Sequence, residues 1–259
     1  MKNKDEIKSE VIGVIKNLIL IENKKVYIKG KEPKNLDDLE YGENKDIIKE
    51  LLLFFDIILH INDKQSKEKL KFNIFKKQNY SLEHIHAQNS ESLKSYIKED
   101  KEIKWFEEVF SYFQYILQYT KDDSVKAKVE ELIRNIYNLV NNNLEYSSKD
   151  EEGKEQYKES ILEQIDEKLE QIDKIIGDNI HSIGNLVLLE QSINSSLNNS
   201  LFQHKKKKLE KSSEYMLKQT RQIFYNSDSK FWGPKEKENH ANNINSAIVT
   251  FMGNLNKDN

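Results

Sequence analysis

The neighbouring residues Glu83 and His84 have side chains that together could hydrolyse a phosphodiester. A carboxylate binds hard divalent cations, and an imidazole titrates near neutral pH, where it can take a proton from water. Phosphodiester hydrolysis uses both groups, because a cation stabilises charge on the phosphate while a base activates the attacking water. Neighbours on a strand point to opposite faces, so both reach one phosphate only if the strand bends or ends there.

A second unusual segment, residues 183–194 (IGNLVLLEQSIN), carries two candidate amides. Asn185 lies in an apolar stretch of strand length, where a buried amide needs hydrogen-bond partners. Asn194 follows nine residues later, where we expect a helix to begin. Residues 80–86 also alternate as a strand does, so we expect the two segments to pair and to bring these side chains together.

Two further histidines flank this constellation. On a regular strand His86 shares the face of His84, because side chains two residues apart point the same way. We therefore consider a supporting role for His86 in binding the phosphates of a nucleic acid. His181 precedes the second segment and is a candidate for contact with the site.

Positive charge is concentrated just after these segments, in Lys205, Lys206, Lys207 and Lys208. Residues 201–237 contain 10 Lys or Arg against 4 Asp or Glu, a net charge of +6, whereas residues 90–180 contain 13 against 22, a net charge of −9. A basic segment in an otherwise acidic chain predicts a face that binds a polyanion such as DNA. A solvated helix end would show the same pattern, and both interpretations stay open here.

Helices must position these groups, because helical periodicity dominates the rest of the chain. Apolar residues recur at spacings of three and four in several stretches, from which we predict helices at 6–20, 46–61, 215–225 and 239–255 and a helical region at 90–180. Residues 22–44 are expected to form a loop with room for one short strand, and 141–153 a polar loop. The predicted fold class is mainly α.

Composition restricts the possible metal ligands and the compartment. Cysteine is absent, so any metal must be held by carboxylate, imidazole, amide or water, and no disulfide can form. The first apolar run, residues 11–21, contains Lys16 and Asn17 and fits neither a secretory signal nor a membrane span. We therefore expect a cytoplasmic protein without a membrane partner.

The combined pattern resembles the HNH nuclease domains of the GmrSD type, which belong to the ββα-metal (His-Me finger) superfamily of bacterial restriction and anti-phage proteins. The resemblance is carried by the Glu-His-Ile of 83–85, by 183–189 (IGNLVLL), by Asn194 and by 198–205 (NNSLFQHK). Segments 39–42, 71–75 and 231–234 resemble the lead-in and tail of the same group.

The resemblance implies a role for each matching residue. Glu83 and Asn194 correspond to metal ligands, for Mg²⁺ or Mn²⁺. His84 corresponds to the general base, and Asn185 to the residue that orients the histidine and its loop. Phe202 and Lys205 correspond to the packing aromatic and the basic partner of the motif helix. With His86 and the lysines of 205–208 as expected DNA contacts, these residues form the complete predicted site.

The implied organisation is a small ββα-metal core with a long helical insertion between its two strands. We expect a helical lead-in at 1–78, the core at 79–89 and 181–210, the insertion at 90–180, and C-terminal helices packing on the core at 211–259. We do not expect these 259 residues to contain the sensor module that is usually fused to such nucleases. A sensor or ATPase partner, or a missing N-terminal module, is therefore expected.

Two functions from different classes are compatible with these observations. The first is an HNH endonuclease or nickase acting on DNA in restriction or antiviral defence, and the second is an inactive HNH-like helical module that binds DNA or a protein. The presence of Glu83, His84, Asn185 and Asn194 together favours the enzyme. Phosphate chemistry by itself does not distinguish DNA from RNA.

Overall fold

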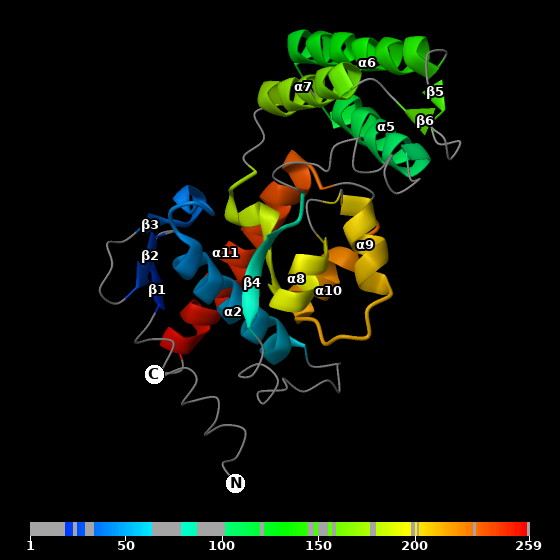
Figure 1. The fold of residues 1–259 in the computed structure, drawn as a ribbon. Helices are drawn as coiled ribbons and strands as arrows, with labels where there is room; N and C mark the ends of the chain where they lie inside the picture. Colours follow the sequence, from blue (N-terminus) through cyan, green and yellow to red (C-terminus); the bar gives the residue numbers. More distant parts are fainter. Residues whose placement is uncertain are drawn as a thin grey trace.

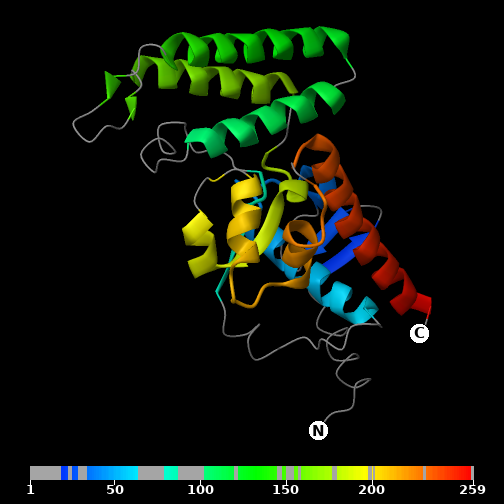
Figure 2. The same ribbon diagram turned by 90° about the vertical axis from the view of Figure 1, so that its right-hand side faces the viewer.

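The computed structural model describes residues 19–22, 25–28, 34–63, 79–86, 102–119, 122–144, 148–149, 155–156, 159–176, 180–197, 200, 202–229 and 232–257. Two views at right angles show helices α5, α6 and α7 as a separate layer at one end of the remaining elements (Figures 1 and 2). We call these three helices the helical arm and the remainder the core. None of the described helices is both long enough and apolar enough to cross a membrane.

The N-terminal part of the core contains strands as well as helix. An antiparallel sheet of β1 (Ile19–Glu22), β2 (Lys25–Ile28) and β3 (Lys34–Asn35) precedes the short 3-10 helix η1 (Leu36–Asp38) and helix α2 (Lys45–Asn62). The expected helix at 6–20 is therefore wrong at its end, since β1 begins at Ile19. Residues 6–18 lie outside the described residues. Helix α2 matches the prediction at 46–61 because its apolar residues are buried around most of its circumference.

Two segments about one hundred residues apart form the central antiparallel ribbon. Strand β4 (Tyr80–His84) pairs with β7 (Leu186–Glu190), with Glu83 opposite Val187 and His84 opposite Leu186. The pairing predicted from alternation is confirmed. The second strand begins later than expected, because residues 183–185 form the 3-10 helix η2 (Ile183–Asn185).

Helices follow the ribbon and cover it. Helices α8 (Gln191–Leu197) and α9 (Phe202–Glu210) come directly after β7, followed by α10 (Lys218–Phe224) and α11 (Pro234–Lys257). Helix α11 begins earlier than predicted, with Pro234 in the first helical position, where the missing N–H costs nothing. It packs against η2 and α2.

Strand β7 is buried on both faces. Leu186 and Leu188 belong to an apolar cluster with α2 and α11, whereas Val187 and Leu189 belong to another cluster with α8, α9 and α10. This two-sided burial explains the continuous apolar run in the sequence. The ribbon thus lies between two apolar clusters, and each side chain of β4 points toward one of these clusters.

The helical arm has its own apolar core. It consists of α5 (Glu102–Tyr119), α6 (Asp123–Leu144) and α7 (Glu159–Ile176), with a small ribbon of β5 (Ser148–Lys149) and β6 (Glu155–Gln156). The predicted loop at 141–153 is therefore shorter, since α6 continues to Leu144. Helix α5 meets the core through Tyr115, whose hydroxyl donates a hydrogen bond to Glu236 at the start of α11.

Candidate active site

The register of the ribbon assigns Glu83 and His84 to opposite faces. Ile85 donates its backbone N–H to the carbonyl of Asn185 over 2.8 Å. In an antiparallel pair, the backbone N–H and C=O groups of alternate residues point to the partner strand. Those of Ile85 point to β7, so the carbonyls of Leu82 and His84 point away from it. Ile85 belongs to the apolar cluster on the α8–α9 side, which is also the side of Glu83. Strand β4 ends at His84. The side chains of Glu83 and His84 can reach one phosphate only if the strand bends or ends at this point, so this requirement is met.

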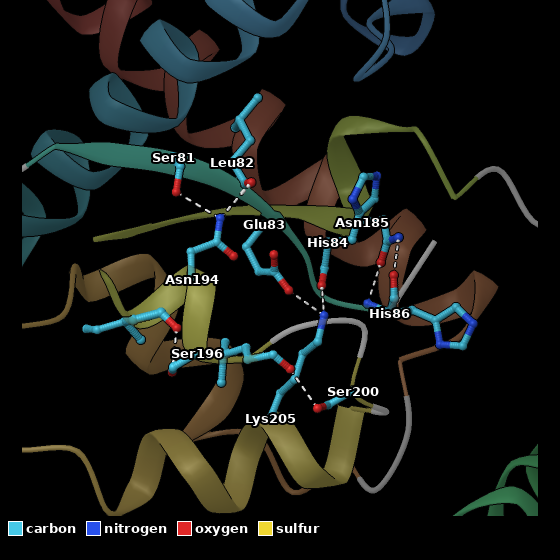
Figure 3. A network of polar contacts seen from close by, with 12 residues as sticks. Ser81, Leu82, Glu83, His84, His86, Asn185, Asn194, Ser196, Ser200 and Lys205 are labelled. Atoms are coloured by element: carbon cyan, nitrogen blue, oxygen red, sulfur yellow. Dashed lines mark hydrogen bonds and ion pairs between the residues drawn. The ribbon is translucent and has the colours of Figure 1, made fainter. Parts of the chain in front are cut away.

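Glu83 forms an ion pair with Lys205 of helix α9. The ammonium group also donates to the carbonyl of His84 over 2.6 Å, so Lys205 contacts both residues of the dipeptide (Figure 3). The side chain of Lys205 is 1% exposed and that of Glu83 is 12% exposed. Burial raises the pKa of Glu83, and the charge and hydrogen bond of Lys205 oppose this shift.

Asn194 lies on the same side of β4 as Glu83. Its amide nitrogen donates to Ser81 Oγ over 2.8 Å and to the carbonyl of Leu82 over 3.2 Å. These bonds fix the orientation of the amide, and its carbonyl oxygen turns toward the Glu83 side chain (Figure 3). A carboxylate and an amide oxygen that share one side are ligands suited to Mg²⁺ or Mn²⁺.

No group of three or more His, Asp or Glu side chains that could form a metal cage occurs among the described residues. The candidate metal site is therefore a small one, built from Glu83 and Asn194. Mg²⁺ commonly uses only one or two protein ligands and completes its shell with water and substrate phosphate. The donor set fits such an ion, with Lys205 as an additional cation already bound to the carboxylate.

The ring of His84 lies on the other face of β4. It contacts Tyr41 at 4.5 Å and His181 at 5.8 Å between ring centroids, and its Nε2 atom is buried without a hydrogen-bond partner. Burial lowers the pKa of His84 to about 4, and the positive charges of Lys205, His181, Lys237 and Lys45 add to this effect. The imidazole is therefore neutral at pH 7 and can accept a proton.

Asn185 joins the segment that follows β4 to the segment that precedes η2, at one end of the ribbon. Its side-chain oxygen accepts the N–H of His86 over 2.8 Å, and its nitrogen donates to the carbonyl of His86 over 2.9 Å. The same nitrogen donates to the carbonyl of Ile180 over 2.9 Å. The buried amide thus has the partners that its apolar surroundings require. It holds the segment immediately after His84.

Two of the expected DNA contacts are buried in this structure. His86 is 1% exposed and its ring lies 5.7 Å from that of Tyr112 in α5, because the chain bends after His84 instead of continuing as a strand. Lys205 is also 1% exposed, since it lies on the face of α9 that contains Phe202 and Leu209. Neither side chain lies at the surface of this structure, and a contact of His86 or Lys205 with DNA stays a prediction.

The remaining lysines of the run lie nearer the surface. Lys206 is half-buried and donates to the carbonyl of Ser227 over 2.5 Å, whereas Lys207 and Lys208 are exposed. Lys208 also donates to the carbonyl of Ser196. A surface cavity of about 240 Å³ lies between α8 and the end of α9, where Lys208 lines it, and it contains neither Glu83 nor His84.

Several residues near the site were not singled out from the sequence. Tyr41 contacts His84, and Lys45 lies 4.2 Å above the ring of Tyr41. Tyr41 also donates its backbone N–H to the carbonyl of His181 over 2.9 Å, which ties the lead-in to the loop before η2. Its position in the segment 39–42, part of the family resemblance, was the signal that could have identified it.

A family model described as GmrSD restriction endonucleases, C-terminal domain, matches residues 113–246, just over half of the chain. The chain belongs to this family. No curated protein and no solved structure matches it. Membership of the GmrSD family supports a nuclease role in restriction for this chain, and such a role implies DNA as the substrate.

The match to the GmrSD C-terminal domain includes Asn185, Asn194 and Lys205. Glu83 and His84 precede the matched range and reach it through the pairing of β4 with β7. The range also spans helices α6 and α7 of the helical arm.

Proposed function

We propose that this GmrSD-type domain is a metal-dependent HNH endonuclease that hydrolyses DNA phosphodiester bonds as the effector of a restriction or anti-phage system. The observation that carries the proposal is the pairing of β4 with β7, which brings Glu83 and His84 beside Asn185. Asn194 of α8 reaches the same strand through Ser81 and Leu82. Residues about one hundred positions apart would thus form one site with the composition of an HNH centre.

Glu83 and Asn194 would hold Mg²⁺ or Mn²⁺. When bound, this ion supplies a Lewis acid that stabilises charge on the phosphate and on the departing oxygen. Support comes from the fixed orientation of the Asn194 amide, whose two donated hydrogen bonds leave its carbonyl oxygen for a cation. Ser81 and the backbone of Leu82 therefore position a ligand without binding the ion.

His84 would take the proton of the attacking water. Its buried and neutral imidazole has a nitrogen, Nε2, without a protein partner. Since His84 and Glu83 lie on opposite faces, the phosphate would have to approach β4 at its end, where the strand stops at His84. The negative charge of that phosphate raises the pKa of His84 toward neutrality, which makes it a stronger base when DNA is bound.

Lysines of helix α9 would bind the DNA backbone beside the site. Lys206, Lys207 and Lys208 follow Lys205 directly, so DNA that reaches Glu83 passes close to them. Such contacts are independent of sequence, because they are made to phosphates. We propose that choice of DNA is supplied by a sensor or ATPase partner, on this chain or another.

One observation favours the second candidate, an inactive HNH-like module that binds DNA or a protein. The ion pair between Glu83 and Lys205 neutralises the carboxylate that a metal would need. If this ion pair persisted in the presence of metal, the site would bind DNA without cutting it. The two functions are therefore separated by a direct test of metal-dependent cleavage.

The test incubates the purified chain with supercoiled plasmid and Mg²⁺ or Mn²⁺, with and without EDTA. We expect nicked or linear product that EDTA abolishes, and we expect Glu83→Gln to remove it. Glu210→Gln is the matched control, because it makes the same change at an exposed position of α9. Cleavage that persists in EDTA, or in Glu83→Gln, would contradict the proposal. Binding of plasmid without cleavage under all metal conditions would support the inactive module.

A further inference from the structure

Lys205 is an unusual lysine because its charged group is inside the protein. Its helix is anchored by Phe202, which stacks on Phe224 at 5.5 Å and lies 5.8 Å from Trp232. Lys205 follows Phe202 by three residues, so both side chains lie on the buried face of α9. A buried ammonium group is unfavourable unless it is paired, and the partners here are Glu83 and the carbonyl of His84.

The same carboxylate is the only anion in the candidate ligand set. Asn194 is neutral, and the described residues hold no larger acidic or histidine cluster that could form a cage. Lys205 already balances the charge of Glu83, so a divalent cation arriving there meets a carboxylate that is occupied. It also meets a fixed positive charge in a region of low dielectric, where repulsion is strong.

A DNA phosphate changes this balance. The group made of Glu83 and Lys205 has no net charge, and a divalent ion would leave two uncompensated positive charges in a largely buried site. A phosphate that binds at the same place supplies negative charge and a further oxygen ligand. The ion and the phosphate therefore favour each other's binding, and the presence of Lys205 strengthens this dependence.

We propose that Lys205 is a built-in competitor of the divalent cation at Glu83, which keeps metal binding weak in the free protein and makes it depend on DNA phosphate. This inference rests on the proposed metal site of Glu83 and Asn194. In this role Lys205 positions Glu83 and limits the binding of the divalent cation until DNA is present. Coupling of this kind is reciprocal, so the metal must raise DNA affinity by the factor by which DNA raises metal affinity.

The experiment measures Mn²⁺ binding to the full chain by electron paramagnetic resonance of the free ion, with and without a duplex oligonucleotide. All proteins carry His84→Ala so that the DNA stays intact. Lys205→Met removes the charge but keeps much of the side chain, and Lys205→Arg keeps the charge. Lys207→Met is the matched control, since it makes the same change at an exposed position of the same helix.

Without DNA, we expect Lys205→Met to bind Mn²⁺ more tightly than the parent by about 10-fold or more, the size of effects from residues next to a metal ligand. Addition of DNA should tighten Mn²⁺ binding strongly in the parent and weakly in Lys205→Met. Lys205→Arg and Lys207→Met should behave as the parent does. Unchanged or weaker Mn²⁺ binding by Lys205→Met would overturn the inference and show that Lys205 only orients Glu83.

A second measurement does not use Lys205→Met, in case this variant fails to fold. A buried, hydrogen-bonded lysine ammonium group gives an observable ¹⁵N-correlated NMR signal, which Lys205→Arg identifies by its loss. Saturating Mg²⁺ together with DNA should shift this signal, and an unchanged signal would overturn the inference. Failure of the metal site itself looks different, because Glu83→Gln would then leave Mn²⁺ binding unchanged in every protein.

Discussion

Asn185 holds His86 by both backbone groups, accepting its N–H and donating to its carbonyl, although the two residues are 99 positions apart. Asn185→Asp keeps the size of the side chain but removes the donor to the carbonyls of His86 and Ile180. Loss of two buried hydrogen bonds, at about 1–3 kcal/mol each, should lower the free energy of unfolding by at least about 2 kcal/mol. Chemical denaturation measures this change.

Cleavage should fall together with stability in Asn185→Asp, because the segment that follows His84 loses its support. Asn142→Asp, at an exposed position of α6, is the control and should change the free energy of unfolding by less than about 0.5 kcal/mol. Equal behaviour of the two variants would show that the amide of Asn185 does not hold the loop.

Gly184 allows η2 to lie directly against helix α11. A Cβ atom at this position would lie 2.1 Å from the carbonyl oxygen of Lys237, which belongs to backbone that cannot move freely. Gly184→Ala should therefore separate η2 from α11 and strongly lower the thermal unfolding temperature. Gly253→Ala, within α11 and with nothing within 4 Å, should instead raise stability by about 0.5–1 kcal/mol. A harmless Gly184→Ala would mean that η2 and α11 do not pack this closely.

Acid should destabilise the core through His240. This histidine lies between Phe55 and Trp232, and burial lowers its pKa from 6.5 to about 4. Between these two pH values the unfolded chain binds more protons than the folded one, so the free energy of unfolding must fall as pH drops from 6.5 to 4. The buried imidazoles of His84 and His86 act in the same direction.

Denaturation of the wild type and His240→Gln across this pH range measures the effect. The variant should show a shallower loss of stability with acid, while the difference between the two proteins stays constant above pH 7. Parallel curves throughout the acid range would show that His240 is not kept neutral by the fold.

The exposed lysines of α9 should contribute to DNA affinity without regard to sequence. Neutralising Lys207 and Lys208 to Gln should weaken binding to all duplexes alike and lower the slope of log affinity against log salt by about 0.9 for each DNA phosphate that the protein no longer neutralises. Lys128 and Lys174, exposed on the helical arm, provide a control pair with the same change. An unchanged salt slope in the Lys207 and Lys208 variant would place the DNA path elsewhere.

Periodicity predicted the elements whose buried faces are regular. Helix α2 and the helices of the arm follow from apolar spacing, and the pairing of β4 with β7 from alternation and from a continuous apolar run. These patterns are reliable because burial repeats with the geometry of the element. The first residues of β1 were assigned to a helix, because a short apolar run fits either period.

Burial of the polar residues was harder to predict. A run of four lysines suggests a surface, yet helical spacing places Lys205 on the same face as Phe202 and Leu209. His86 was expected to share the face of His84, but the strand ends and the chain turns its ring toward Tyr112. Residue type thus identified the candidate chemistry, while the partner of each charge depended on tertiary contacts that the sequence does not state.

The most direct test of the central claim is the single-turnover rate of DNA cleavage by the wild type and by His84→Ala, with metal and enzyme in excess. Loss of a general base should reduce the rate constant by about 10²–10⁴-fold, while DNA affinity and the unfolding temperature stay near those of the wild type. That result would place the proton transfer at His84. A wild-type rate constant in His84→Ala would contradict the account, because no other described residue combines its unpartnered nitrogen with a position next to Glu83.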